Sequence, residues 1–113
     1  MNFTENLVLK EHYTFLVADM DGQVEGGERG LYDHDTKFLS RYTWSWAARG
    51  QQLMSLAVAT PRPDTLYAHH ALIEGPSQVL AVRRTARIAA SRLRDEIEVS
   101  NTSLMEEELV LSL

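Results

Sequence analysis

The sequence predicts an all-β protein, an antiparallel β-sandwich formed by a single domain over residues 1–113. Two observations predict it. Apolar side chains recur at every second position in several short segments, which is the period of a half-buried strand. Turn-forming residues separate these segments at intervals of roughly ten residues, as in sandwich proteins. With 44% hydrophobic and 24% charged residues, the chain is long enough to bury one modest core.

The amino-terminal segments are short. Residues 7–10 and 13–18 indicate two strands, or one strand with a break at Glu11-His12. A turn follows, because Asp21-Gly22 supplies a residue that tolerates positive φ. We expect a loop over residues 19–35, since its middle is rich in glycine and poor in apolar side chains.

An aromatic strand is predicted over residues 36–48, where the alternation is strict. Arg49-Gly50 then predicts a tight hairpin turn. One face of the strand would carry the aromatic side chains and the other face mostly polar ones. The first face comprises Phe38, Ser40, Tyr42, Trp44 and Trp46, and the second Lys37, Leu39, Arg41, Thr43 and Ser45.

The second half begins with a return strand that Pro61 and Pro63 are expected to end, because proline removes ladder donors. Another strand is expected over residues 66–73. Residues 79–99 fit both a helical stripe and two strands with a bend near Ala90-Ser91, and the pattern alone slightly favours the helix. A last strand is predicted to end at Leu113.

One motif resembles a known family. Gly30-Leu31-Tyr32 followed by Asp35-Thr36-Lys37-Phe38-Leu39-Ser40 resembles the Gly-Leu-aromatic and Asp-Thr-Arg-Phe-Leu-Ser signature of the amino-terminal β domain of bacterial glycogen-debranching-enzyme-like proteins, the amylo-α-1,6-glucosidase family. The resemblance extends over residues 7–113 and implies two strands in 79–99. Lys37 stands where this family usually has arginine, which removes a bidentate contact at that position.

The resemblance implies a non-catalytic domain that packs against a catalytic (α/α) helical barrel absent from this chain. It also implies that residues 32–38 lie at the rim of the barrel's active site, where an α-glucan would bind. The candidate substrate contacts are then Tyr32, Asp35, Thr36 and Lys37. The alternative is a self-standing β-sandwich that binds a ligand or forms an oligomer without belonging to an enzyme.

The residues themselves predict no glycosidase activity for this chain alone. Glycoside hydrolysis needs two carboxyl groups on opposite sides of the scissile bond. Asp33, Asp35 and Glu28 all lie near one corner. We expect Asp35 and Thr36 to make local hydrogen bonds there, the aromatic stripe to be core, and Tyr32 to be the exposed aromatic residue.

Composition disfavours several other functions. The chain has no cysteine, and adjacent His69-His70 would point to opposite faces of a strand, so we expect neither metal nor cofactor. A net charge of −5 disfavours nucleic acid, and the arginines between residues 83 and 94 indicate a solvated strand face or an interdomain salt-bridge seam. No apolar run suggests a membrane span, and the lack of cysteine predicts a cytoplasmic location.

The final strand, residues 104–113, carries Leu109, Leu111 and Leu113 on one side. Ending on an apolar strand suggests that the chain is part of a larger sandwich. A sheet edge left without its partner favours pairing with a second copy, so we expect a homo-oligomer formed through this strand.

Overall fold

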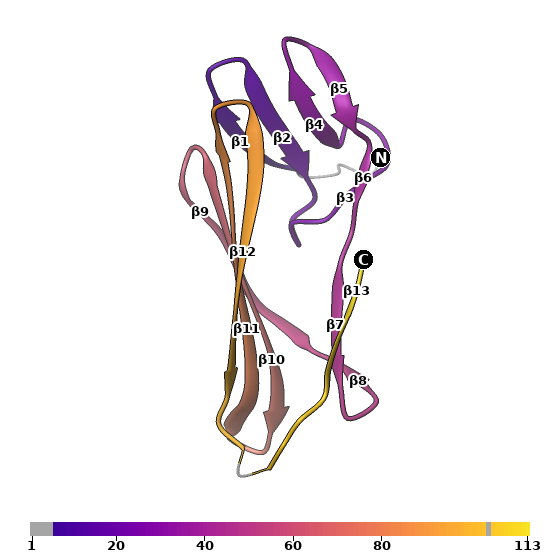
Figure 1. Ribbon diagram of the computed structural model, residues 1–113, viewed down its shortest axis with the longest axis vertical. Coiled ribbons are helices and arrows are strands. Elements are labelled where there is room, and N and C mark those ends of the chain that lie inside the picture. The colour runs from indigo at the N-terminus through magenta and orange to yellow at the C-terminus, as the bar shows by residue number, and fades with distance from the viewer. Residues whose placement is uncertain (1–5, 104) are drawn as a thin grey trace, which may run out of the picture.

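The computed structural model describes residues 6–103 and 105–113, and in this part of the chain all regular structure is β-strand. Antiparallel sheets pack face to face in a sandwich-like arrangement (Figure 1). The all-β fold class is therefore confirmed.

One layer is a four-stranded sheet with the order β12-β11-β10-β9. Its strands are the longest of the molecule: β9 (Met54–Arg62), β10 (Thr65–Glu74), β11 (Ser77–Ala89) and β12 (Arg92–Asn101). Residues 79–99 thus form two strands, and the turn between them places Ala90 and Ser91 at φ 50° and 60°. The helical alternative for this segment is wrong, because pairing on both sides of β11 outweighs the helix preference of its alanines and arginines.

The opposite layer consists of shorter strands (Figure 1). Its larger sheet has the order β1-β2-β4-β5, a second sheet has the order β13-β7-β8, and β3 pairs with β6. The larger sheet comprises β1 (Leu7–Glu11), β2 (Thr14–Ala18), β4 (Gly30–Asp33) and β5 (Thr36–Leu39). The remaining strands are β3 (Val24–Glu25), β6 (Arg41–Tyr42), β7 (Ser45–Ala48), β8 (Gln51–Gln52) and β13 (Leu109–Ser112).

The aromatic segment 36–48 is not one strand but three, β5, β6 and β7. A register shift between β4 and β5 interrupts the alternation, and Phe38 is 70% exposed instead of sharing the inward face with Trp44. Trp44 and Trp46 are buried as expected.

Three further boundaries differ from the sequence prediction. The last strand, expected over residues 104–113, is β13 at Leu109–Ser112. The expected loop over 19–35 contains β3 and β4, which pair with β6 and β2. Pro61 lies inside β9 instead of ending it. β9 is the edge of its sheet, where a missing N–H removes no ladder bond.

The core consists of two neighbouring clusters of buried side chains between the layers. Tyr42 and Val58 pack against both clusters and so connect them. Burying each large apolar side chain contributes on the order of 1.5–3 kcal/mol. The first cluster contains Trp44, Trp46, Ala48, Leu53, Ala68, Leu72, Leu80 and Val82, and the second Leu9, Leu16, Ala18, Val24, Leu66, Ala86 and Ile88.

Candidate functional site: the hairpin end of the sandwich

Three hairpin turns, those of β1–β2, β4–β5 and β11–β12, gather at one end of the sandwich (Figure 1). The backbone N–H of His34 donates to the carbonyl oxygen of Tyr13 at 3.0 Å, and the rings of these two residues stack with centroids 4.8 Å apart. The backbone N–H of Ala90 donates to the Glu11 carboxylate at 3.0 Å. Because these contacts join turns distant in sequence, the end that carries residues 32–38 is braced.

The β4–β5 turn has the two-residue geometry that suits a twisted hairpin. His34 and Asp35 both have positive φ, 49° and 65°, as a type I′ turn requires. At the start of the hairpin, a Cβ atom on Gly30 would lie 2.7 Å from the carbonyl oxygen of Leu39. Glycine is therefore required at the first position of the motif, because the two strands approach closely there.

Tyr32 does not have the exposed position expected of it, because it lies on β4 and is half-buried. Its ring stacks on Phe15 of β2, with centroids 4.6 Å apart, and the Lys37 Nζ atom of β5 lies 5.5 Å from the ring centroid. Its hydroxyl donates to the carbonyl oxygen of Glu28 at 2.6 Å. Since neighbours from both adjacent strands contact the ring, Tyr32 braces the hairpin and is not an open platform for sugar stacking.

Lys37 is exposed but already has a partner. Its Nζ atom donates to the carbonyl oxygen of Gly27 at 3.1 Å, which fastens the loop before β4 to the hairpin. The side chains of Asp35 and Thr36 are exposed at the turn itself. The structure therefore brings all four candidate contacts into one hairpin and leaves two of them directed at solvent.

Asp33, and not Asp35, makes the local side-chain bonds at this corner. Its Oδ1 atom accepts a hydrogen bond from the Thr14 hydroxyl at 2.7 Å, and its Oδ2 atom lies 3.2 Å from Nδ1 of His34. The hydrogen bond from Thr14, followed by the one from His34, lowers the pKa of Asp33 below its usual range. A carboxylate held ionised in this way suits a structural role more than that of a general acid.

A buried ion pair, which the sequence analysis did not predict, lies between the two layers. Arg84 was expected on a solvated face or seam, yet it is 1% exposed, and its Nε atom lies 2.7 Å from Oδ1 of Asp95. Its guanidinium also donates to the carbonyl oxygen of Gly22 at 3.2 Å and lies 4.6 Å from the ring of Trp44. The Tyr42 hydroxyl donates to the same carboxylate. Burial, followed by this hydrogen bond, raises the pKa of Tyr42 to about 12.

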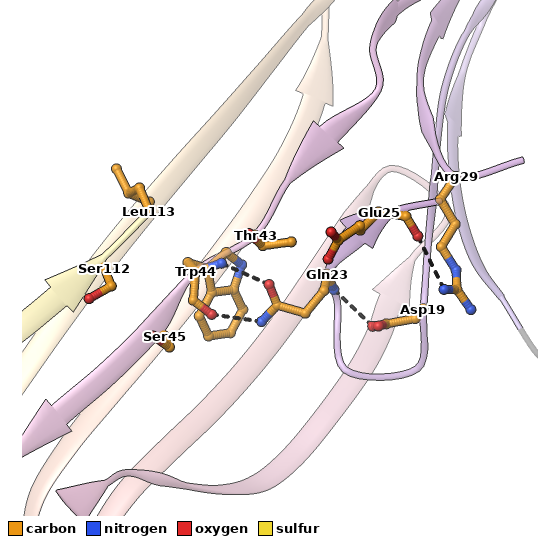
Figure 2. A pocket seen from close by; sticks show the side chains of 9 residues that line it. All are labelled: Asp19, Gln23, Glu25, Arg29, Thr43, Trp44, Ser45, Ser112 and Leu113. Atoms are coloured by element: carbon orange, nitrogen blue, oxygen red, sulfur yellow. Dashed lines mark hydrogen bonds between the residues drawn. The ribbon is translucent and has the colours of Figure 1, made fainter. Parts of the chain in front are cut away.

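An open pocket of about 440 Å³ lies beside the 19–29 segment (Figure 2). Several of its polar groups bond one another. The Gln23 side chain exchanges two hydrogen bonds with the backbone of Trp44, at 2.8 and 2.9 Å, and Asp19 accepts from the backbone N–H of Gln23 at 2.9 Å. Arg29 donates to the carbonyl oxygen of Glu25 at 3.3 Å. The pocket is lined by Asp19, Gln23, Glu25, Arg29, Thr43, Trp44, Ser45, Ser112 and Leu113.

Residues 6–103 and 105–113 contain no cluster of three or more His, Asp or Glu side chains placed to hold a metal ion. Over the same residues the structure has no helix of the length and apolarity that crossing a membrane requires.

Comparison with known proteins decides the family. Residues 9–113 match the family described as the N-terminal domain of (some) glycogen debranching enzymes. The chain belongs to this family. Neither a curated protein nor a solved structure matches it.

In this glycogen-debranching-enzyme N-terminal domain, the matched region includes the whole β4–β5 hairpin and the tips that brace it. That end of the domain presents the exposed side chains of Asp35 and Thr36 next to the exposed rings of Tyr13 and Phe38. Sequence reasoning missed Asp33 and Arg84 as the residues that hold the frame. The alternation of β11 carried a signal for Arg84, because it falls on the same face as Val82 and Ala86.

Proposed function

We propose that this domain is non-catalytic, packs against the catalytic (α/α) barrel of a glycogen debranching enzyme, and places residues 32–38 at the rim of the active site. The observation that carries the proposal is the braced hairpin end. There Tyr13 and Phe38 are each 70% exposed, next to the exposed polar side chains of Asp35 and Thr36. Aromatic side chains surrounded by polar ones are typical of protein–protein interfaces.

At the rim, Asp35 and Thr36 are the residues that would meet the hydroxyl groups of an α-glucan. Both are exposed at a turn whose backbone is fixed by positive φ values. Tyr32 and Lys37 would support these two residues without touching the glucan, because their contacts with Phe15 and Gly27 hold the hairpin in shape. A turn that is already ordered loses little conformational entropy on binding.

The lack of catalysis follows from where the carboxylates lie. Asp33 and Asp35 belong to the same hairpin turn, and Asp33 is already bound to Thr14. Retaining and inverting glycosidases hold their two carboxyl groups on opposite sides of the bond, about 5 to 9.5 Å apart across a cleft. A single protruding turn offers no such opposed pair.

The experiment begins with the gene, since the proposal requires the reading frame to continue past Leu113 into a helical barrel. That barrel, produced without residues 1–113, is titrated with this chain, and binding is measured by calorimetry. We expect binding, and Phe38→Ala should weaken it roughly tenfold, as loss of an aromatic anchor does. Met54→Ala, at an apolar position 59% exposed on β9, is the matched control and should bind like the native chain. Equal effects of the two substitutions would place the contact elsewhere.

A role for the turn is tested separately from packing. Asp35→Ala combined with Thr36→Ala should leave the affinity for the barrel within about twofold, because exposed polar rim groups contribute little to binding. The same variant should raise the KM of the assembled enzyme for a branched α-glucan. An unchanged KM would confine the hairpin to packing.

The alternative, a self-standing module that forms oligomers, is favoured by the final strand. β13 pairs with β7, yet Val110, Leu111 and Leu113 remain exposed. The segment before it is held by Arg49, which bonds Glu107 and lies 2.7 Å from Glu74. We also propose that the isolated domain associates with itself through this strand and that the protein is cytoplasmic.

A further inference from the structure

Strand β12 forms an open edge of the long sheet. In the described part of the chain it pairs with β11 alone, over all ten residues from Arg92 to Asn101. An edge of this length presents a row of backbone N–H and C=O groups to a further strand. β13, by comparison, offers only four residues.

The charges on β12 reverse in order about its centre. The residues of its outward face alternate with those of the inward face, because successive side chains point to opposite sides of a strand. On the outward face, Arg92 and Arg94 come before the central position and Glu96 and Glu98 after it, whereas Asp95 at the centre faces inward toward Arg84. The sequence is therefore complementary to itself when read in the opposite direction.

We propose that β12 pairs antiparallel with β12 of a second copy of this chain, with the two-fold axis at Asp95. In that register Arg92 lies opposite Glu98 and Arg94 opposite Glu96, each pair twice. On the inward face Leu93 lies opposite Ile97, and Asp95 lies opposite its own copy, where each carboxylate is already neutralised by the Arg84 of its own chain. A shift of two residues either way would bring Arg94 against Arg94 or Glu96 against Glu96. Opposed charges on directly paired residues stabilise a sheet and like charges destabilise it, so the charges select one register.

In the single copy, β12 makes a like-charge contact that the second copy would offset. Arg94 lies directly opposite Arg87 of β11, which places like charges side by side. Its own partner is Glu96 on the same strand, at 3.5 Å, and both side chains are largely exposed. Glu96 of the second copy would add an opposite charge to this row. Ile97, which is 44% exposed, would gain an apolar neighbour.

The assembly would close at two copies. The opposite edge of the sheet is β9, which contains Pro61. Proline has no N–H to donate, so that edge does not extend the sheet in the same way. A two-fold contact uses the same patch on both copies and is complete with two. This inference is independent of the barrel contact and of the final strand.

The charges are tested by sedimentation equilibrium of the full chain over a concentration series. Arg94→Glu should raise the dimer dissociation constant roughly tenfold, because each like-charge pair occurs twice across the axis. In the single copy it relieves the like-charge contact with Arg87 and removes only the exposed pair with Glu96, so stability should change little. Arg94→Glu combined with Glu96→Arg restores opposed charges and should restore the dimer. Arg62→Glu, with the same charge change on β9, is the control and should dimerise like the native chain.

The register is tested by cross-linking, which the absence of native cysteine makes clean. Chains with Arg92→Cys are mixed with chains with Glu98→Cys and oxidised, and a disulfide-linked dimer is expected in the mixture. Neither variant alone should cross-link through the strand, because in that register its two cysteines would lie roughly 20 Å apart. A monomer at all concentrations, a charge swap that fails to restore the dimer, or equal cross-linking of either variant alone would each overturn the proposal.

Discussion

Arg84 and Asp95 form an ion pair between the two layers of the sandwich, with the Arg84 Nε atom 2.7 Å from the Asp95 Oδ1 atom. Arg84 is 1% exposed and the Asp95 side chain 13%. The pair joins β11 and β12 to the opposite layer, since Tyr42 bonds the carboxylate and Trp44 lies under the guanidinium. A buried charge is tolerated only when its partner is present, so each member of the pair depends on the other.

Asp95→Ala is therefore expected to reduce the free energy of unfolding by about 3–5 kcal/mol, because it leaves the Arg84 charge buried without its partner. Urea unfolding measures the change. The control is Arg41→Ala, which removes one member of the exposed Arg41–Glu25 pair. An exposed pair contributes about 1 kcal/mol or less. Similar losses in the two variants would show that burial does not set the energy of the Arg84 pair.

Because the pKa of Tyr42 is raised by folding, we expect the protein to lose stability in alkaline solution. Its pKa is raised to about 12 in the folded protein, first by burial and then by the bond to Asp95. Below a pH of about 10 the phenol is neutral in both the folded and the unfolded state, so its full contribution to the free energy of unfolding is present. Between pH values of about 10 and 12 the unfolded state loses its proton first, so stability falls as the pH rises. Tyr42→Phe should lack this fall. Unfolding free energies of both proteins between pH 9 and 12 test this, and parallel curves would contradict it.

The alternation places Trp44 and Phe38 on one face, but truncating Trp44 should reduce stability far more than truncating Phe38. Trp44→Ala is expected to cost about 3–5 kcal/mol of stability, because the side chain is 5% exposed in the larger core cluster. Phe38→Ala should change stability by about 0.5 kcal/mol or less, as exposed positions do. Thermal melts of the two variants suffice. A larger loss from Phe38→Ala would mean that its ring is covered in solution.

Much of this fold can be predicted from local pattern. The alternation correctly buries Trp44 and Trp46, but it cannot show where a strand slips by one residue, and that slip exposes Phe38. Residues 79–99 are ambiguous because alanine and arginine favour helix locally, whereas pairing with distant strands determines the outcome. Local sequence pattern therefore does not show which distant strands will pair in the folded protein.

The site shows the same division. The hairpin motif located the turn, and Asp35 and Thr36 are exposed there as a contact site requires. Tyr32 is covered by Phe15, and that contact depends on the pairing of β2 with β4, which the motif does not contain. The role expected of Asp35 belongs to Asp33, because its partner Thr14 comes from that same distant strand.

Whether the domain is non-catalytic is decided by assaying glucose release from a branched α-glucan by the purified 113-residue chain. We expect no release above the buffer blank at any pH between 4 and 9, because Asp33 and Asp35 share one turn and cannot flank a glycosidic bond. Asp35→Asn is measured in parallel. Glucose release by the native chain that Asp35→Asn abolishes would instead make the hairpin a catalytic site.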